Sequence, residues 1–347
     1  MVDPAAHLPE RTCMTDWTSL HGDLFAGSRA MVTGAGGFIG SHIAEALVKL
    51  GARVIALDDL SGGERDNVDV AAASSPGSVE FVEASVLDES VVRRAMDGCR
   101  YVFHQAALPS VPRSIEIPRR FHEVNVTGTQ ALLDLAVESG VERVMFAASS
   151  SAYGDSETLP KIETMPALPK SPYAANKLAG EHLMRAYASC FDIDTASLRY
   201  FNIFGPRQNA NSVYSGVIAI FAKMLLAGEA PTIYGDGEQS RDFTFVDNAV
   251  HANLLAAAST TPIDGEVINV ACGVRITVNE LVATMTRLMD RSDIQPVYRP
   301  DRAGDVKHSL ADMARASNLL GYTPIVDFAT GMDATVAWYR QALGAVG

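Results

Sequence analysis

The sequence predicts an α/β protein built on a Rossmann-type doubly wound parallel sheet, with a smaller α/β lobe interleaved with it. Three observations lead to this prediction. Up to Gly205, short apolar strand candidates alternate with amphipathic helices, as in a parallel sheet that has helices on both faces. A glycine-rich turn follows the first strand, where a dinucleotide-binding loop has to lie. Beyond Gly205 the alternation stops, and loops rich in Gly, Asn and Pro separate shorter helices.

The part of the chain before Gly205 carries the strands and helices of the main domain. Strand candidates are short apolar runs, and helix candidates repeat apolar residues every three or four positions. The strands are expected at residues 29–33, 53–57, 79–83, 101–104, 143–148 and 194–199. The helices are expected at residues 38–50, 88–97, 118–139 and 171–191. Residues 28–205 should therefore form a dinucleotide-binding domain, preceded by a polar, weakly structured lead of residues 1–27 with one short helix.

The rest of the chain predicts a second lobe. Helices are expected near residues 216–227, 246–258, 277–290, 311–320 and 330–343. Residues 267–270 have the pattern of one more strand, and we expect that strand to return to the main sheet and bring residues 242–272 with it. The second lobe then consists of residues 206–241 and 273–347.

Composition restricts the possible partners of the chain. A net charge of −13 argues against general nucleic-acid binding, because no basic stripe is available to neutralise a run of phosphates. A small anionic ligand remains possible, since 22 of the 28 basic residues are Arg, which suits bidentate anion binding. The four cysteines lie far apart, so we expect reduced thiols, no zinc site and no disulfide framework. Without a long apolar segment or a signal-peptide pattern, we expect a cytoplasmic protein with no membrane partner.

The glycine-rich turn after the first strand has the spacing of a dinucleotide-binding loop. Gly34, Gly37 and Gly40 permit a tight turn, close approach of the backbone to a pyrophosphate, and tight packing of the helix on the strand. Asp58 ends the second strand, the expected place for a carboxylate that binds the adenine ribose. That carboxylate would repel the 2′-phosphate of NADP, so the expected cofactor is NAD.

Tyr173 and Lys177 stand four residues apart in an expected helix, so they share one face. A nearby ammonium lowers the pKa of a phenol from about 10 toward neutrality, which makes the phenolate a usable base. Ser149, Ser150 and Ser151 follow the strand at residues 143–148 and should lie at the edge of the sheet where ligands collect.

These motifs resemble the extended short-chain dehydrogenase/reductase family, and among its members the NAD-dependent nucleotide-sugar epimerases, closest to UDP-N-acetylglucosamine/UDP-glucose 4-epimerases. The resemblance covers roughly residues 28–325 and rests on the segments at residues 33–40, 149–154 and 173–177. It implies that Ser149, Tyr173 and Lys177 are catalytic, with Tyr173 as the base. It also implies transient oxidation at C4 of the sugar, with hydride returning to the opposite face.

The resemblance assigns a set of cofactor contacts. They are Gly34, Gly37, Phe38, Ile39, Gly40, Asp58, Ser85, Val86, Ala106, Asn125, Tyr173 and Lys177. Ser85 is a departure, because the family commonly has an adenine-contacting Asp at that position. Related dehydratases and decarboxylases carry acids where this chain has Ser150 and Ser151, so we expect epimerisation.

Substrate contacts follow from the same resemblance. They are expected from Ser110, Ser149, Ser150, Ser151, Asn202, Arg241, Arg302, Asp305 and Ser309. The two Arg side chains would clamp the diphosphate and Asp305 would bind the uridine ribose. The small Ser309 would leave room for an N-acetyl group, which favours UDP-GlcNAc/UDP-GalNAc, with UDP-Glc/UDP-Gal also possible. Asn209 stands where UDP-uronate epimerases typically have an Arg.

Other interpretations remain open. The chain could be a UDP-uronate or dTDP-hexose 4-epimerase, or a non-catalytic dinucleotide-sensing protein of the same fold. His104 and His308 invite catalytic roles by residue type, but their positions favour structural or solvated ones. A homodimer is expected by resemblance, through the helices near residues 118–139 and 171–191.

Overall fold

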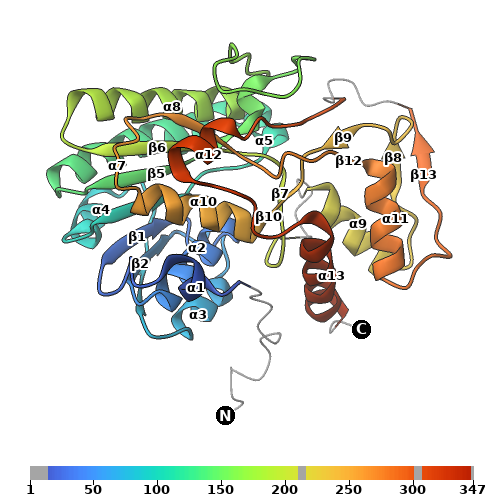
Figure 1. The fold of residues 1–347 in the computed structure, drawn as a ribbon, viewed down its shortest axis with the longest axis horizontal. Coiled ribbons are helices and arrows are strands. Elements are labelled where there is room, and N and C mark those ends of the chain that lie inside the picture. The colour runs from blue at the N-terminus through green and yellow to red at the C-terminus, as the bar shows by residue number, and fades with distance from the viewer. Residues whose placement is uncertain (1–14, 210–215, 301–306, 345–347) are drawn as a thin grey trace.

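The structure, a computed structural model of the chain, describes residues 15–209, 216–300 and 307–344. Its centre is a seven-stranded parallel sheet in the order β3-β2-β1-β4-β5-β6-β11 (Figure 1). The strands are β1 (Arg29–Thr33), β2 (Arg53–Asp58), β3 (Ser78–Glu83), β4 (Tyr101–His104), β5 (Arg143–Ser149), β6 (Asp194–Tyr200) and β11 (Val267–Val270). All of them were expected from the sequence, and β11 returns to the sheet beside β6 as predicted.

Helices cover both faces of this sheet because its strands are apolar on both sides. Ala30 and Val32 of β1 belong to one buried cluster, while Met31 between them belongs to another. The first cluster is covered by α1 (Trp17–His21), α2 (Phe38–Lys49), α3 (Arg65–Ala72) and α10 (Val246–Ala258). The second is covered by α4 (Glu89–Met96), α7 (Gly128–Glu138) and α8 (Pro172–Cys190).

A third apolar cluster forms the smaller lobe at the other end of the molecule (Figure 1). It is built by the expected helices α9 (Val217–Leu226), α11 (Val278–Leu288) and α13 (Phe328–Gly344). The expected α12 (Ala314–Leu320) lies against β11 instead. Short strand pairs complete the lobe and its junction: β7 (Ile203–Phe204) with β10 (Thr244–Phe245), β8 (Thr232–Tyr234) with β13 (Val297–Arg299), and β9 (Ser240–Arg241) with β12 (Ile276–Thr277). They were not predicted, because two or three residues are too few to show a period.

Two sequence-based expectations need correction. Residues 15–27 are not weakly structured: the short helix α1 is present, and Trp17 and Phe25 are buried in the first cluster. The helix expected at residues 118–139 is divided into α6 (Pro118–His122), a π-helical turn (Glu123–Thr127) and α7.

Helices α3 and α5 (Val111–Glu116) were missed; α5 begins at a Ser110 cap and contains Pro112, a start signal the sequence did offer. Among the described residues, no helix has the length and apolar character needed to span a bilayer.

Candidate active site

The glycine turn between β1 and α2 has no room for side chains at two of its glycines. Gly34 has φ +69°, and a Cβ there would lie 2.7 Å from the Ala106 nitrogen. A Cβ on Gly40 would lie 2.1 Å from the Gly34 oxygen. Gly37 is the N-cap of α2, whose first backbone N–H groups lack intrahelical partners. The turn therefore forms a bare backbone cradle at a helix N-terminus, which fits the pyrophosphate of a dinucleotide.

Asp58 lies at the end of β2, next to this cradle. Its Oδ2 accepts a hydrogen bond of 2.8 Å from the Gly36 N–H, and its Oδ1 accepts one of 2.8 Å from the Leu60 N–H. Burial raises the pKa of its carboxyl, and the two backbone donors oppose that shift. The side chain is thus held in place beside the glycine turn, as a ribose-binding carboxylate requires.

The other expected cofactor residues surround the same edge of the sheet. Ala106 donates its N–H to the Thr33 hydroxyl at 3.2 Å. The Asn125 amide, on the π-helical turn, binds the Leu108 backbone at both ends, with Oδ1 accepting at 2.8 Å and Nδ2 donating at 3.1 Å. We therefore assign Asn125 the shaping of the loop after β4, which is one use of such π-helical turns at functional sites.

The remaining members of the cofactor set lie on either side of that edge. Val86 is buried, and the Oγ of Ser85 accepts a hydrogen bond of 3.4 Å from the Leu87 N–H. Phe38 and Ile39, in the first turn of α2, pack against the cluster of the smaller lobe. The start of the cofactor helix is thereby joined to the second lobe.

Ser149, the last residue of β5, begins a tight 3-10 turn (Ser150–Tyr153). Its Oγ lies 2.8 Å from the Oγ of Ser151 and accepts a hydrogen bond of 3.2 Å from the Ser151 N–H. All three Ser side chains are partly buried. Ser149 therefore has a fixed orientation at the carboxyl edge of the sheet, where ligands of this fold class collect.

Tyr173 and Lys177 come to this edge on α8, which Ser171 caps through its Oγ. The Ser149 side chain acts to lower the pKa of the Tyr173 hydroxyl, but burial acts more strongly and raises that pKa. Lys177 is buried; its Nζ donates to the Ala147 oxygen at 2.7 Å and lies 4.9 Å from the centre of the Phe146 ring. Burial lowers the pKa of Lys177 to about 8.

This geometry corrects one expectation. We expected the Lys177 charge to bring the pKa of the phenol toward neutrality, yet in the protein alone the pKa of Tyr173 is raised by burial. The ammonium is directed at the backbone of β5, so the chain provides the right pair of groups without lowering the phenol pKa by itself.

The two histidines considered from the sequence both bond hydroxyl side chains of the protein. His104 is fully buried, with Nδ1 2.8 Å from the Thr33 hydroxyl and Nε2 2.9 Å from the Thr129 hydroxyl. Burial lowers the pKa of His104 to about 3, so it is a neutral structural group, as expected. His308 lies 2.9 Å from the Ser240 hydroxyl through its Nδ1.

The substrate-side residues come from separate segments. Asn202 has φ +39° and donates from Nδ2 to the Asp242 oxygen at 3.1 Å. Arg241, on β9, donates from Nη1 to the Ser240 oxygen at 3.0 Å, and the Ser309 N–H donates to the same oxygen at 3.0 Å. The structure thus brings Arg241 and Ser309 together. The expected contacts Arg302 and Asp305 lie outside the described residues.

Ser110 has a local role in the fold. Its Oγ accepts from the Arg113 N–H at 3.2 Å and caps α5. The side chain is largely buried at this cap. A contact between Ser110 and substrate is therefore left as an expectation.

Sequence reasoning missed Asp242, although it stands beside Arg241 in the same motif. Its buried carboxylate accepts hydrogen bonds from the backbone N–H groups of Cys272, Gly273 and Ala311 at 3.0, 3.0 and 3.2 Å. Burial raises its pKa to about 6. Asp242 therefore ties together three loops at the carboxyl side of the sheet, and the Arg-Asp pair in the sequence was the available signal.

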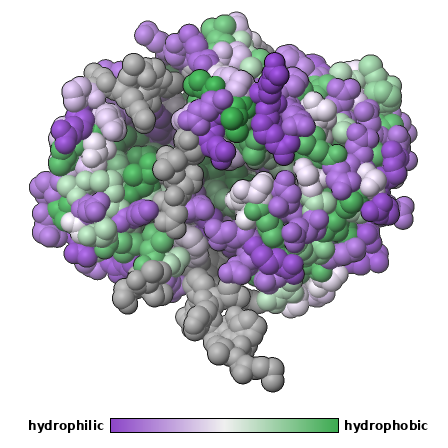
Figure 2. Space-filling model, turned by 180° about the vertical axis from the view of Figure 1, so that it is seen from behind, coloured by the Kyte–Doolittle hydropathy of each residue, from purple (hydrophilic) through white to green (hydrophobic). Residues whose placement is uncertain are grey.

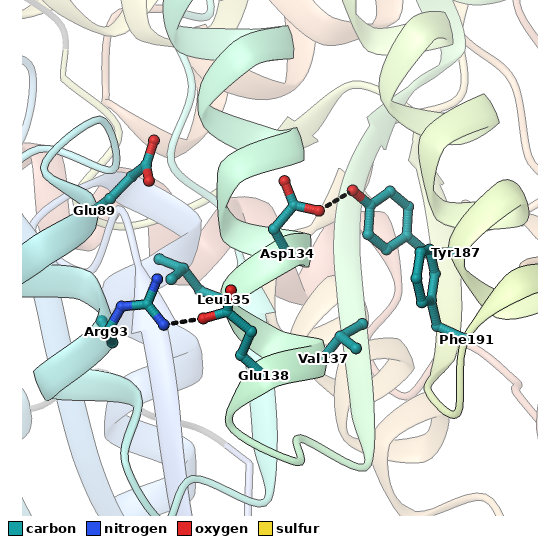
Figure 3. A pocket seen from close by; sticks show the side chains of 8 residues that line it. All are labelled: Glu89, Arg93, Asp134, Leu135, Val137, Glu138, Tyr187 and Phe191. Atoms are coloured by element: carbon teal, nitrogen blue, oxygen red, sulfur yellow. Dashed lines mark hydrogen bonds and ion pairs between the residues drawn. The ribbon is translucent and has the colours of Figure 1, made fainter.

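The surface offers two kinds of depression. On the face seen in Figure 2, a hollow opens near the middle of the molecule with apolar residues at its floor. A separate cavity of about 340 Å³ lies between α4, α7 and the end of α8 (Figure 3). In it, Tyr187 donates to Asp134, and Arg93 pairs with Glu138. None of the expected site residues lines this cavity, so we place the candidate site at the sheet edge.

Comparisons with known proteins agree with this geometry. A profile of the NAD dependent epimerase/dehydratase family matches residues 30–271. UDP-glucose 4-epimerase of Mycolicibacterium smegmatis is 38% identical over 315 residues, covering 90% of this chain and 99% of that protein.

Solved structures of similar enzymes have the same fold. UDP-N-acetylglucosamine 4-epimerase of Methanobrevibacter ruminantium, in complex with UDP-N-acetylmuramic acid, has a TM-score of 0.86 at 37% identity and covers 92% of this chain and 100% of that one. UDP-glucose 4-epimerase of Thermus thermophilus, in complex with NAD, has a TM-score of 0.78 at 35% identity and covers 90% of this chain and 99% of that one.

Proposed function

Since the chain belongs to the NAD dependent epimerase/dehydratase family, we propose that it is an NAD-dependent 4-epimerase of a UDP-sugar, an isomerase. The observation that carries the proposal is the placing of Ser149 beside Tyr173, close enough to act on the pKa of the phenol, with Lys177 one helical turn further along α8. This constellation lies at the carboxyl edge of the sheet that also bears the glycine cradle. A base, a hydroxyl partner and a dinucleotide cradle together suit reversible oxidation of a secondary alcohol.

NAD is the cofactor, and the residues of the cradle fit it. The bare backbone of Gly34, Gly37 and Gly40 would hold the pyrophosphate, and Asp58 would hold the adenine ribose. When bound, NAD supplies reversible hydride transfer at C4 of the sugar.

The protein's own groups handle the proton. Tyr173 takes the proton of the C4 hydroxyl on its Oη and later returns it. Ser149 orients that hydroxyl through its Oγ, and Lys177 stabilises the phenolate with its charge. Because burial holds the pKa of Tyr173 high in the protein alone, the phenolate must depend on positive charge close to it in the loaded site.

The residues after β5 support epimerisation over elimination or decarboxylation. Ser150 and Ser151 carry only hydroxyls, so the site has no second acid or base at these positions. Hydride then returns to the same sugar on its opposite face, and inversion at C4 is the net change.

The sugar we favour is an N-acetylhexosamine, UDP-GlcNAc/UDP-GalNAc, with UDP-Glc/UDP-Gal as further substrates. Ser309 is small, and its backbone is held against β9 beside Arg241. Asn209 offers no positive charge to a uronate carboxylate. Asn202, Arg241, Arg302 and Asp305 are proposed to hold the nucleotide diphosphate and ribose, with Ser110 nearer the sugar.

The two lobes divide this work in the proposal. Residues 28–205 and 242–272 bind NAD, and residues 206–241 and 273–347 bind the UDP-sugar.

We also propose a homodimer formed through α6–α7 and α8; α8 exposes Ala175 and Ala186, small side chains that permit close helix packing. A cytoplasmic location suits the free thiols of Cys99, Cys190 and Cys272.

Product analysis with a panel of sugar nucleotides tests the proposal. The panel contains UDP-GlcNAc, UDP-Glc, UDP-glucuronate and dTDP-glucose, each incubated with the purified protein and NAD. We expect C4 inversion of UDP-GlcNAc without net NADH. Turnover of the uronate or the dTDP-sugar alone would replace our assignment by one of those epimerases, and absence of turnover with retained NAD binding would indicate a dinucleotide-sensing protein.

A further inference from the structure

A third functional group follows Tyr173 and Lys177 on the same face of α8. Glu181 stands one helical turn beyond Lys177, just as Lys177 stands one turn beyond Tyr173. Its side chain is 2% exposed and accepts two hydrogen bonds from Arg199 on β6. The Arg199 Nε lies 2.8 Å from Oε1, and Nη2 lies 2.6 Å from Oε2. This is a bidentate ion pair inside the protein, beneath the candidate site.

Arg199 also contacts the segment that carries Ser149. Its guanidinium lies 4.6 Å from the centre of the Tyr153 ring, which closes the turn that Ser149 begins. The Tyr153 hydroxyl in turn donates to the Asn269 side chain at 2.7 Å. The remaining Arg199 nitrogen, Nη1, has no hydrogen-bond partner within the described part of the chain. A single buried ion pair therefore touches both segments that supply the proposed catalytic groups.

Burying such a pair is costly, because two charges lose their hydration. Packed apolar residues of similar volume often give equal or greater stability, so fold stability alone does not account for its place here. The negatively charged residue of the pair, Glu181, lies four residues after Lys177 on the same face of α8.

We propose that Glu181 and Arg199 are positioning residues for the C4 oxidation: Glu181 holds the Lys177 ammonium in its charged form, and Arg199 fixes Glu181 and the Ser149–Tyr153 turn relative to each other. The inference rests on the proposed function, because it gives Lys177 a role in stabilising the Tyr173 phenolate. Neither residue contacts the reacting atoms in this scheme.

The charges around Lys177 make Glu181 its principal counter-charge. From its own helix, Lys177 faces Tyr173 and Glu181. From β5 it meets the uncharged Phe146 ring and the Ala147 oxygen. From β4 comes His104, which is neutral because burial lowers its pKa to about 3.

Burial favours the neutral amine of Lys177 and lowers its pKa to about 8, whereas Glu181 opposes that shift. Arg199, on β6, is the positive charge paired with Glu181. Without Glu181, Lys177 would lose its proton at a lower pH, and the phenolate would lose its partner charge.

Two variants separate a charge effect from a packing effect. Glu181→Gln combined with Arg199→Met removes both charges at similar volume and leaves no unpaired buried ion. Arg199→Lys alone keeps both charges but replaces the bidentate contact with a single one. The pH dependence of kcat and the phenolate absorbance of the NAD-loaded enzyme, each corrected with a Tyr173→Phe version, are the readouts.

We expect the neutral pair to narrow the active pH range from both sides. The alkaline limb of kcat, which reports the loss of the Lys177 proton, should move to lower pH by about one unit. The pH at which the Tyr173 phenolate forms should rise by about one unit. Arg199→Lys should lower the unfolding temperature but leave the alkaline limb of kcat and the phenolate titration unchanged. The proposal would be overturned if the Glu181→Gln/Arg199→Met variant left the alkaline limb and the phenolate titration unchanged. It would also be overturned if Arg199→Lys narrowed the active pH range as much as the double variant does.

A matched control is the Arg143–Asp194 ion pair, which joins the same two strands, β5 and β6, at their amino ends. Arg143→Met with Asp194→Asn should reduce stability without moving either limb. Failure of the proposed function is recognised separately: full turnover in Tyr173→Phe would remove the base itself, whatever the Glu181 variants do.

Discussion

The Lys177 Nζ atom donates a hydrogen bond of 2.7 Å to the main-chain oxygen of Ala147. This bond joins α8 to β5 two residues before Ser149, and the Phe146 ring supports the ammonium from the same strand. An ammonium has three donors, so two remain for other acceptors at the site. The contact fixes the distance between the two elements that carry the hydroxyl pair Ser149 and Tyr173, and the predictions on catalysis depend on it.

Tyr173→Phe should abolish turnover while NAD binding is retained. The substitution removes only the hydroxyl that accepts the C4 proton, so we expect kcat to fall by about 10²–10⁴-fold or more. Initial rates and NAD titration check this. Tyr187→Phe on the same helix is the control, because Tyr187 hydrogen-bonds Asp134 at a distant surface and its loss should leave kcat unchanged.

Ser149→Ala should lower kcat more than Ser151→Ala does. Ser149 is the hydroxyl that acts on the pKa of Tyr173, whereas the hydrogen bond of the Ser151 hydroxyl is to Ser149 itself. We expect about a 100-fold loss for Ser149→Ala. Parallel kcat measurements on both variants decide the order; equal losses would show that the two hydroxyls act as one unit.

Gly40→Ala should weaken NAD binding and destabilise the fold. The new Cβ would meet the Gly34 oxygen at 2.1 Å, so α2 has to move away from the turn, at a cost of about 1–3 kcal/mol. Calorimetric NAD titration and thermal unfolding measure the two effects. Gly62→Ala is the control, since no atom lies within 4 Å of its Cβ position, and wild-type behaviour is expected there.

Gly180→Ala tests how α8 approaches β5. A Cβ at this position would lie 2.3 Å from Cζ of the buried Phe146 ring, which also supports Lys177. We expect a loss of about 1–3 kcal/mol in unfolding free energy together with reduced kcat. Adding Phe146→Leu should recover much of the stability, because it frees the space. If the Gly180→Ala/Phe146→Leu double variant is as unstable as Gly180→Ala alone, this steric explanation is wrong.

His251 should make the fold sensitive to acid. His251 is buried beside His21, and its Nδ1 lies 3.0 Å from the Nε2 of His21. Burial lowers the pKa of His251 to about 4. An unfolded His titrates near 6.5, so between pH 6.5 and 4 the unfolded chain binds a proton that the folded chain excludes. Stability therefore falls as the pH falls through this range, by about 3 kcal/mol in total.

The corresponding measurement is the unfolding temperature from pH 7 to pH 4. His251→Asn, which does not titrate, should start lower at pH 7 but decline less steeply toward acid. The exposed His182→Asn serves for comparison and should follow the wild-type slope. A wild-type slope in His251→Asn would show that other groups cause the acid sensitivity.

Most of the fold could be predicted because its signals are local. Apart from the edge strand β3, the strands of the main sheet are runs of mostly buried residues, and the glycine spacing at residues 34–40 marks the first crossover. What was missed had weak local signals: α3, the two-residue strands, and the π-helical turn that directs Asn125 toward Leu108. The burial of Trp17 and Phe25 was missed because contacts between residues 15–27 and distant segments, such as His21 with His251 and Phe25 with Tyr101, leave no trace in a short window.

The sequence by itself determined the topology class, the cofactor cradle and the identity of the proposed catalytic groups. These depend on periodicity, on glycines whose Cβ atoms would collide, and on residue types at fixed helical spacing. Only the tertiary structure decided the protonation energetics. Burial holds the pKa of Tyr173 high and lowers that of Lys177, and the Glu181–Arg199 pair brings charge from two distant segments beneath them. Burial and the separation of charges are properties of packed elements, so no local pattern in the chain could state them.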